Sequence, residues 1–223
     1  MRFLDFLAPP SCVFCGVASV GQEKSICRAC FADLPWNQPP VATSPGIIES
    51  VVAVTHYAFP VDKAIKAFKF ERKLFYSLAL AEILCAAGDA LSSDIDAILP
   101  VPLHWSRKLR RGFNQAAEIA KPVARLLNVP IIRCAKRCKP TPYQSGLDAR
   151  ARMRSLRGAF ITSRKVDCQH VLIIDDVVTT GATTQALAKT LIDAGVRRVS
   201  VLAVARAVRH NRGDYQPAVG LKV

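Results

Sequence analysis

The 223-residue sequence has no long apolar stretch, although 51% of its residues are hydrophobic. No run approaches the roughly 18–20 apolar residues of a membrane-spanning helix. The N-terminal residues 1–10 are interrupted by Asp5 and end in two prolines. They therefore lack the apolar core, about 7–15 residues long, of a secretory signal. We expect a cytoplasmic protein without membrane insertion. At about 100–200 residues per domain, the length predicts one main domain with a small appendage.

Acidic residues are scarce. The sequence has 17 Asp and Glu but 31 Lys and Arg, which gives a net charge of +14. Residues 104–158 contain 14 basic residues and only two acids, Glu118 and Asp148. A field of one sign attracts polyanions, which favours a phosphorylated metabolite or a nucleic acid as the partner. Aromatic residues, on which single strands stack, are few in this segment: Trp105, Phe113 and Tyr143. The sequence therefore predicts an anion-binding surface, with modest support for single-stranded DNA.

Short apolar or β-branched runs alternate with segments of helical periodicity from residue 51 onward. The expected strands are 51–59, 95–101, 129–133, 171–174 and 199–205, and the expected helices are two between 61 and 90, then 114–127 and 183–194. Pro122 allows a kink or a break in one helix, and Gly195 is placed to end the last. The alternation predicts an α/β fold, a parallel sheet with helices on both faces and ligands at the carboxyl ends of its strands.

Half of the eight cysteines lie close together near the N-terminus. Cys12, Cys15, Cys27 and Cys30 form two C-x2-C pairs. Two such turns supply the four thiolates of a structural Zn2+ site, and Gly16 suits the turn after the first pair. The alternatives are two disulfides, plain free thiols or an iron–sulfur cluster, and the disulfides are disfavoured because no secretion signal precedes them. The proline-rich residues 35–40 are typical of a linker. We therefore expect a zinc-ribbon module at 1–40 and a second domain at 41–223.

The most informative stretch is 171–183, in which an apolar run precedes Asp175 and Asp176. A loop rich in threonine follows, with Gly181 inside it, and then a helix begins. Backbone N–H groups at a helix N-terminus hold phosphate, and threonine hydroxyls add donors. The two carboxylates suit ribose hydroxyls or Mg2+. The stretch matches neither the dinucleotide-binding G-x-G-x-x-G nor the P-loop, and a capped strand-to-helix turn is the purely structural alternative.

Residues 171–183 resemble the phosphoribosyl pyrophosphate (PRPP) motif of type I phosphoribosyltransferases. Together with the four-cysteine module, they make the chain similar to the ComF/GntX family, double-zinc-ribbon proteins linked to competence and DNA uptake. Other stretches agree, namely 65–70, 100–115 and 144–160. The resemblance implies a type I phosphoribosyltransferase fold with a small N-terminal zinc ribbon. One departure is Ser155, where relatives usually carry asparagine.

The resemblance also implies a role for each part of the motif. Asp175 and Asp176 would contact the ribose hydroxyls, and Arg107 and Arg111 would lie on the pyrophosphate side. Residues 133–157 would form a mobile basic loop over the site. The PRPP-binding residues implied by the motif are Asp175, Asp176, Val177, Val178, Thr179, Thr180, Gly181, Ala182 and Thr183. The implied catalytic residues are Asp175, Asp176, Arg107 and Arg111.

Two functions from different classes follow from the resemblance. The first is Mg2+-dependent phosphoribosyl transfer from PRPP to an unidentified acceptor, for which positioning and leaving-group stabilisation suffice. The alternative is a non-catalytic DNA-uptake protein that binds single-stranded DNA or competence-machinery proteins, with PRPP as ligand or regulator. The intact acidic pair favours a functional PRPP site in both cases, although a fold and a site do not guarantee turnover.

Overall fold

The computed structural model describes residues 11–18, 25–37, 41–42, 46–88, 91, 94–140, 155–156, 158–162 and 165–207. Within these residues, each helix is too short or too polar to cross a membrane.

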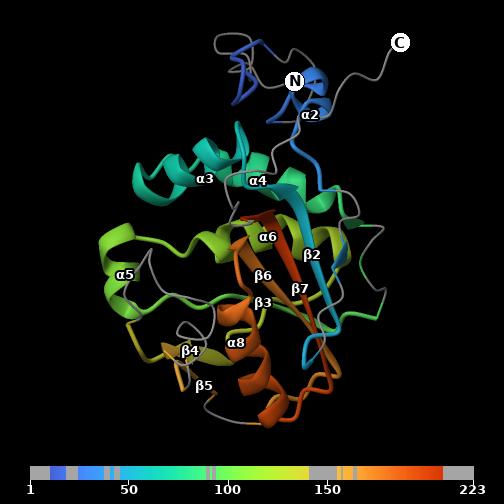
Figure 1. Ribbon diagram of the computed structural model, residues 1–223, viewed down its shortest axis with the longest axis vertical. Helices are drawn as coiled ribbons and strands as arrows, with labels where there is room; N and C mark the ends of the chain where they lie inside the picture. Colours follow the sequence, from blue (N-terminus) through green and yellow to red (C-terminus); the bar gives the residue numbers. More distant parts are fainter. Residues whose placement is uncertain are drawn as a thin grey trace, which may run out of the picture.

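A five-stranded sheet in the order β1-β2-β7-β6-β3 forms the centre of the fold (Figure 1). The four strands β2 (Ser50–His56), β7 (Arg198–Arg206), β6 (His170–Val178) and β3 (Ala97–Pro100) run parallel to one another. The short β1 (Val41–Ala42) pairs antiparallel with β2 at the edge. The predicted parallel α/β architecture is therefore confirmed.

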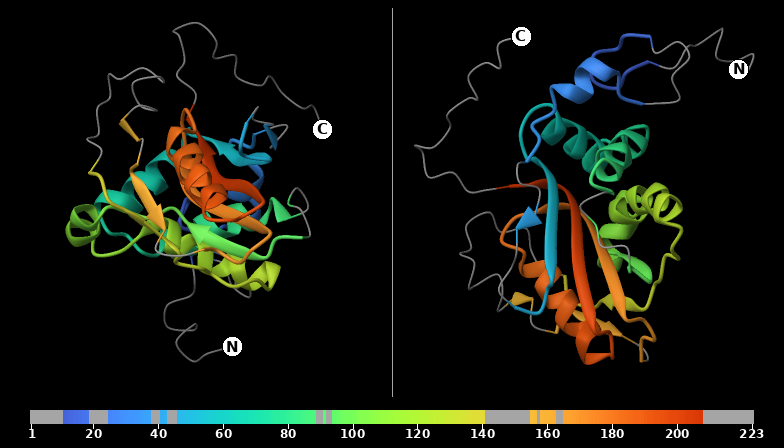
Figure 2. Two further views of the ribbon diagram at one scale, coloured as in Figure 1. Left: turned by 90° about the horizontal axis from the view of Figure 1, so that it is seen from below. Right: turned by 90° about the vertical axis from the view of Figure 1, so that its right-hand side faces the viewer.

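Helices cover both faces of the sheet, as Figure 2 shows. On one face lie α3 (Val61–Phe70), α4 (Tyr76–Cys85) and α6 (Gln115–Leu127), and on the other lies α8 (Ala182–Asp193). Side chains alternate along β6. Leu172 and Ile174 therefore pack into the core beneath α3, α4 and α6, while Val171 and Ile173 pack into the core beneath α8. This two-sided burial explains why 171–174 is apolar throughout.

The N-terminal segment packs against α4, on the face of the sheet that carries α3, α4 and α6. Cys12, Ile26 and Leu34 belong to the same buried core as α4, and the Ser25 N–H donates to Glu82 Oε1 over 2.7 Å. The short α2 (Arg28–Ala32) begins at the second cysteine pair. In the described part of the predicted linker, Pro35 and Asn37 exchange backbone hydrogen bonds with β2. These contacts join the cysteine module to the sheet.

Several predicted elements differ from the structure. The strand predicted at 129–133 is wrong: Ile131 forms only an isolated bridge to Ile98, and Pro130 has no N–H to extend the ladder. The chain instead forms β4 (Ala135–Arg137), which pairs antiparallel with β5 (Phe160–Thr162).

Three further elements differ from their sequence predictions for identifiable reasons. Helix α6 continues through Pro122, because its buried face packs against the sheet on both sides of the proline. Helix α5 (Trp105–Arg111) was not predicted, since it buries none of its residues and so has no apolar periodicity. Strand β6 extends to Val178, so Asp175 and Asp176 lie inside the strand and not after it.

Candidate functional site

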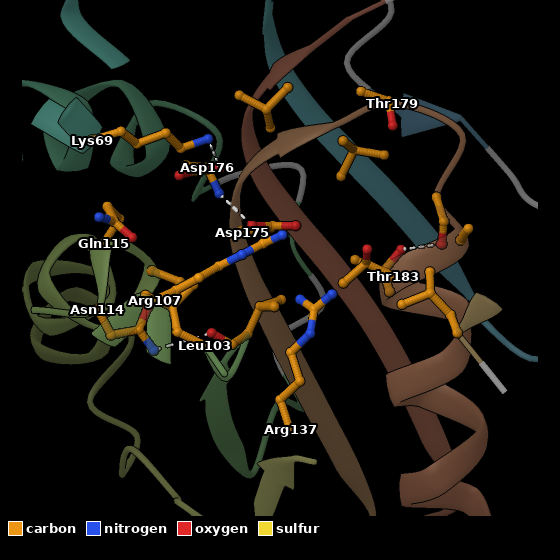
Figure 3. A pocket seen from close by; sticks show the side chains of 18 of the residues that line it. Lys69, Leu103, Arg107, Asn114, Gln115, Arg137, Asp175, Asp176, Thr179 and Thr183 are labelled. Atoms are coloured by element: carbon orange, nitrogen blue, oxygen red, sulfur yellow. Dashed lines mark hydrogen bonds and ion pairs between the residues drawn. The ribbon is translucent and has the colours of Figure 1, made fainter. Parts of the chain in front are cut away.

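A pocket of about 260 Å³ opens at the carboxyl end of β6 (Figure 3). It is slightly smaller than a typical small-molecule site of roughly 300–1,000 Å³. Its walls come from the ends of α3, β3, α5, α6, β4, β6 and α8. The lining residues are Lys69, Val101, Leu103, Arg107, Arg111, Asn114, Gln115, Ala116, Arg137, Ser155, Leu156 and all residues from Asp175 to Thr184.

The acidic pair lies at the centre of this pocket. Asp176 is buried, and its Oδ1 forms an ion pair with Lys69 Nζ at 2.7 Å. Asp175 is half-buried, and its Oδ1 accepts a hydrogen bond from the Asp176 N–H over 2.9 Å. Burial and the neighbouring charge of Asp176 raise the pKa of Asp175 to about 7, against the opposing effects of Lys69 and Arg137. The pair therefore presents one lysine-paired carboxylate and one that changes charge near neutral pH.

The threonine-rich loop leads directly into the N-terminus of α8. Gly181 has φ 72°, a left-handed conformation that glycine adopts without strain, and no side chain caps the helix. The Thr184 hydroxyl donates back to the Gly181 carbonyl over 2.8 Å and tightens the turn. Thr179 and Thr180 are exposed. A helix start of this kind, with threonine hydroxyls around it, suits a phosphate group.

Arginines face the acidic pair from two other elements. Figure 3 shows the side chains of Arg107, from α5, and Arg137, from β4, reaching toward Asp175. Burial, with the nearby charge of Arg107, lowers the pKa of Arg137, while Asp175 opposes that shift. Two guanidinium groups near one half-buried carboxylate form a site suited to a ligand that carries several negative charges.

Arg111 is held in place at the edge of the pocket. Its guanidinium lies 5.2 Å from the Phe70 ring centroid, and its Nη1 donates to Gln115 Oε1 over 3.0 Å. The Gln115 side chain is 1% exposed, and among the described residues its Nε2 has no hydrogen-bond partner. Since arginine is only a donor, the Gln115 amide oxygen faces Arg111 and its buried NH2 group does not.

In Asn114, among the residues that the structure describes, the amide nitrogen is paired and the amide oxygen is not, the reverse of Gln115. Its Nδ2 donates to the Val101 carbonyl over 3.1 Å, and within the described part of the chain its Oδ1 has no partner. The wall at the start of α6 therefore offers a buried donor and a buried acceptor side by side in sequence. Buried polar groups without partners are uncommon in folded proteins, so these two atoms are suited to a ligand.

All eleven residues predicted for the PRPP site line this pocket, namely Arg107, Arg111 and the nine residues from Asp175 to Thr183. Their individual roles stay predictions. Of the predicted basic loop at 133–157, Arg137, Ser155 and Leu156 reach the pocket, while residues 141–154 and 157 lie outside the described residues.

Sequence reasoning did not single out Lys69, Asn114, Gln115 or Arg137. The first three fall in the stretches 65–70 and 100–115, which carried the family resemblance but no assigned role. Arg137 lies in the stretch 133–157, which the resemblance placed over the site, but it had no individual role.

The four N-terminal cysteines form a second site. Their Sγ atoms all lie within 4.8 Å of one another, and Cys15 Sγ is 3.7 Å from Cys27 Sγ. A tetrahedral site with Zn–S bonds of about 2.3 Å separates the sulfurs by about 3.8 Å, whereas a disulfide requires about 2.05 Å. All four cysteines are free thiols in the structure, so the disulfide alternative does not hold.

The geometry around these cysteines suits metal-binding thiolates. Gly16 takes the predicted left-handed conformation, with φ 76°. Burial and the neighbouring cysteines raise the pKa of Cys30, whereas at Cys12 burial is outweighed by hydrogen bonds from the backbone N–H groups of Cys27, Cys15 and Phe14, which lower the pKa to about 6. The Cys27 Sγ accepts a further hydrogen bond from the Cys30 N–H over 3.5 Å. The four residues therefore fit Zn2+. Four thiolates fill its tetrahedral coordination and leave no open position for catalytic water.

A serine, a histidine and an aspartate also meet at the opposite end of the sheet. His170 Nε2 lies 2.9 Å from Ser200 Oγ, and His170 Nδ1 lies 3.2 Å from Asp94 Oδ1. Ser200 is 3% exposed and His170 is 1% exposed, and neither lines the described pocket. A nucleophile must reach its substrate, so this cluster is structural.

The chain is similar in sequence to known proteins. Residues 3–44 match the double zinc ribbon domain. Competence protein F of Haemophilus influenzae is 34% identical over 208 residues, which cover 89% of this chain and 85% of that protein. DNA utilization protein YhgH of Escherichia coli K12 is 32% identical over 195 residues, which cover 83% of this chain and 86% of that protein. Among solved structures, adenine phosphoribosyltransferase from Leishmania tarentolae is 15% identical, with a TM-score of 0.38 over 75% of this chain and 81% of that chain. From its sequence relatives, the chain belongs to the family of competence protein F and DNA utilization protein YhgH.

Proposed function

We propose that this protein binds PRPP together with Mg2+ and transfers the phosphoribosyl group to an acceptor nucleophile. One observation carries the proposal: a single pocket combines two adjacent carboxylates, a helix N-terminus that no side chain caps, and four cationic side chains. PRPP has a diol, a 5′-phosphate and a pyrophosphate, and each of these groups finds a chemically matched partner there.

The pocket divides into three parts in this proposal. Asp175 and Asp176 accept hydrogen bonds from the ribose hydroxyls. The loop from Thr179 to Thr183 and the first turn of α8 hold the 5′-phosphate. Arg107, Arg111 and Arg137 receive the pyrophosphate, whose charge increases as the bond to the ribose breaks, so their stabilisation is greatest in the transition state.

The residues that would receive Mg2+ are the same two aspartates, since carboxylate oxygens are ligands that this ion accepts. Bound beside the pyrophosphate, Mg2+ would neutralise part of the leaving group's charge. The protein's own contribution is positioning. The C1–O bond of the ribose breaks, pyrophosphate departs with the electron pair, and the acceptor forms the new bond to C1 and releases its proton.

The experiment is calorimetric titration of PRPP into the purified protein, with and without Mg2+. We expect Mg2+-dependent binding that is lost in the Asp175→Asn/Asp176→Asn variant. Asp193→Asn is the matched control, because Asp193 lies at the exposed end of α8, outside the pocket. Pyrophosphate release with candidate acceptors then tests turnover. Absence of PRPP binding in the wild type would contradict the proposal.

A second candidate function is the handling of single-stranded DNA in the cytoplasm, with PRPP as ligand or regulator and competence-machinery proteins as partners. The names of the relatives, competence protein F and DNA utilization protein YhgH, favour it, as does the net charge of +14. Asp176→Asn separates the two activities. It should abolish PRPP binding but leave salt-sensitive DNA binding nearly unchanged. Loss of both together would contradict independent sites.

A further inference from the structure

Helix α3 presents a stripe of aromatic and basic side chains to solvent. Phe59, just before the helix, is followed by Lys63, Lys66 and Phe70 at spacings of four, three and four residues, which place them on one helical face. Phe59 is 70% exposed and Phe70 is 63% exposed, which is unusual for phenylalanine. The opposite face of α3 is buried in the core. The stripe therefore contributes nothing to the core and is available for a partner.

Both phenylalanines of this stripe have a cation close to the ring, as does the neighbouring Tyr57, which packs against the core. Lys63 Nζ lies 5.1 Å from the Phe59 ring centroid, and Lys66 Nζ lies 5.7 Å from that of Tyr57. Beyond them, the Arg111 guanidinium lies 5.2 Å from the Phe70 ring. An aromatic face beside a positive charge suits a ligand that combines flat rings with anionic groups.

The surface continues from α3 onto α5. Arg72 Nη2 donates to the Arg110 carbonyl over 2.7 Å, which joins the turn after α3 to the end of α5. Helix α5 presents Trp105, 66% exposed, and the basic Lys108 and Arg110 to solvent. We call this surface the α3–α5 track and define it as Tyr57, Phe59, Lys63, Lys66, Phe70, Arg72, Trp105, Lys108, Leu109 and Arg110.

The net positive charge of the track favours anionic partners. The acids of the same segments are Asp62 and Glu71, and they pair with Lys66 and Lys73. The remaining charges are positive, so the surface repels basic partners and attracts anionic ones. A DNA duplex would offer phosphates but keep its base faces stacked inside. Only a single strand presents unstacked bases and phosphates together.

We propose that the α3–α5 track binds single-stranded nucleic acid, with bases stacked on Phe59, Phe70 and Trp105. The phosphates lie along Lys63, Lys108 and Arg110. This proposal rests on the second candidate function, the handling of single-stranded DNA, and assigns the binding to a defined surface. The basic segment alone contained few aromatic residues, and the fold supplies the missing rings from residues 57–70.

The test is fluorescence anisotropy with a labelled oligothymidine of about 16 nucleotides, measured over a series of salt concentrations. Phe70→Ala and Trp105→Ala should each weaken binding roughly tenfold and leave the salt dependence unchanged, because they remove stacking and no charge. Lys63→Gln/Lys108→Gln should lower the slope of log K against log salt by about 1.4, two phosphate contacts at about 0.7 each. Leu126→Ala and Lys189→Gln, exposed positions on α6 and α8, should behave as wild type.

Several results would overturn the proposal. They are absence of oligothymidine binding, wild-type affinity in both alanine variants, or equal competition by a duplex. Conversion of an oligomer to a monomer by Phe70→Ala, with oligothymidine affinity unchanged, would instead assign the track to contact between copies of this chain.

Failure of this proposal is distinguishable from failure of the PRPP proposal. The Asp175→Asn/Asp176→Asn variant should keep its oligothymidine affinity, and Trp105→Ala should keep wild-type thermal stability and PRPP binding. If Trp105→Ala lost PRPP binding as well, the two surfaces would not be separate and the track as defined would be wrong.

Discussion

Lys69 Nζ lies 2.7 Å from Asp176 Oδ1, so an ion pair connects the last turn of α3 to the carboxyl end of β6. The two side chains are 18% and 10% exposed, which reduces screening by water. The pair places a positive charge beside two adjacent carboxylates and opposes the rise in the pKa of Asp175. It also fixes one wall of the pocket to the sheet that carries the acidic pair.

Replacing Lys69 by methionine should weaken PRPP binding at least about tenfold, because the pocket loses a positive charge that attracts the anionic ligand and the ion pair that positions Asp176. It should also raise the pKa of Asp175 further. Titration of PRPP at several pH values measures both effects. Lys73→Met is the matched control, since Lys73 pairs with Glu71 on the exposed surface. Wild-type affinity in Lys69→Met would show that the ion pair serves folding alone.

PRPP affinity should rise as the pH increases through about 7. The pKa of Asp175 is raised to about 7, mainly by burial and then by the charge of Asp176, so this carboxyl is protonated in the ligand-free protein at lower pH. Acceptance of hydrogen bonds from the ribose diol and contact with Mg2+ both favour the ionised form. The measurement is PRPP affinity at about pH 6 and about pH 8. Asp175→Asn provides the correction for titration of PRPP itself, and a difference equal to the wild type's would contradict the assignment.

The same carboxyl predicts a change in stability with the opposite sign. Because the pKa of Asp175 in the folded protein, about 7, exceeds the ordinary 3.8, the folded state holds more protons between these values. The free energy of unfolding therefore falls as the pH rises from about 4 to about 7. Asp175→Asn should match the wild type near pH 4 and exceed it above pH 7 by up to about 4 kcal/mol. Denaturant unfolding of the ligand-free proteins at both pH values tests this.

Most of the site residues predicted from the sequence lie close together along the chain, and the distant Arg107 and Arg111 were predicted only through the family resemblance. The four cysteines and residues 175–183 each form a local pattern whose chemistry does not depend on distant contacts. The apolar run 171–174 revealed the buried strand before them for the same reason. The zinc site needed only the coordination chemistry of thiolates and the buried strand only its apolar pattern, whereas the PRPP-site residues were implied by the family resemblance.

The missed residues depend on packing between distant segments. Lys69 reaches Asp176 only because α3 lies across the end of β6, and Arg137 reaches the pocket because β4 pairs with β5. Such pairing has no periodic signature in a strand of three residues. The wrong strand at 129–133 has a related cause. Its β-branched residues fit the pattern, but the chain makes a single bridge there before it turns away.

Removing zinc should lower the stability of the whole protein, because the cysteine module shares its core with α4. Cys12, Ile26 and Leu34 are buried in that core, and the Phe14 ring centroid lies 6.5 Å from that of Tyr76. Chelation should lower Tm by at least about 5 °C, since loss of a ligand that binds only the folded state destabilises it. Thermal melting monitored by near-ultraviolet circular dichroism, with released zinc quantified by a colorimetric chelator, measures this. An unchanged Tm after complete zinc release would favour two independent domains at 1–40 and 41–223.

Gln115 should be required for PRPP binding through its amide NH2 group and not only through its contact with Arg111. Its Oε1 accepts from Arg111 over 3.0 Å, whereas among the described residues its Nε2 has no partner. Gln115→Glu keeps the acceptor for Arg111 but replaces the donor with a second acceptor and adds a negative charge. The variant should lose PRPP affinity by at least about tenfold, because a donor to the anionic ligand is replaced by a negative charge. Gln115→Met removes both contacts and should lose affinity as well. If Gln115→Glu bound PRPP as tightly as wild type while Gln115→Met did not, the side chain would act only by holding Arg111 in place.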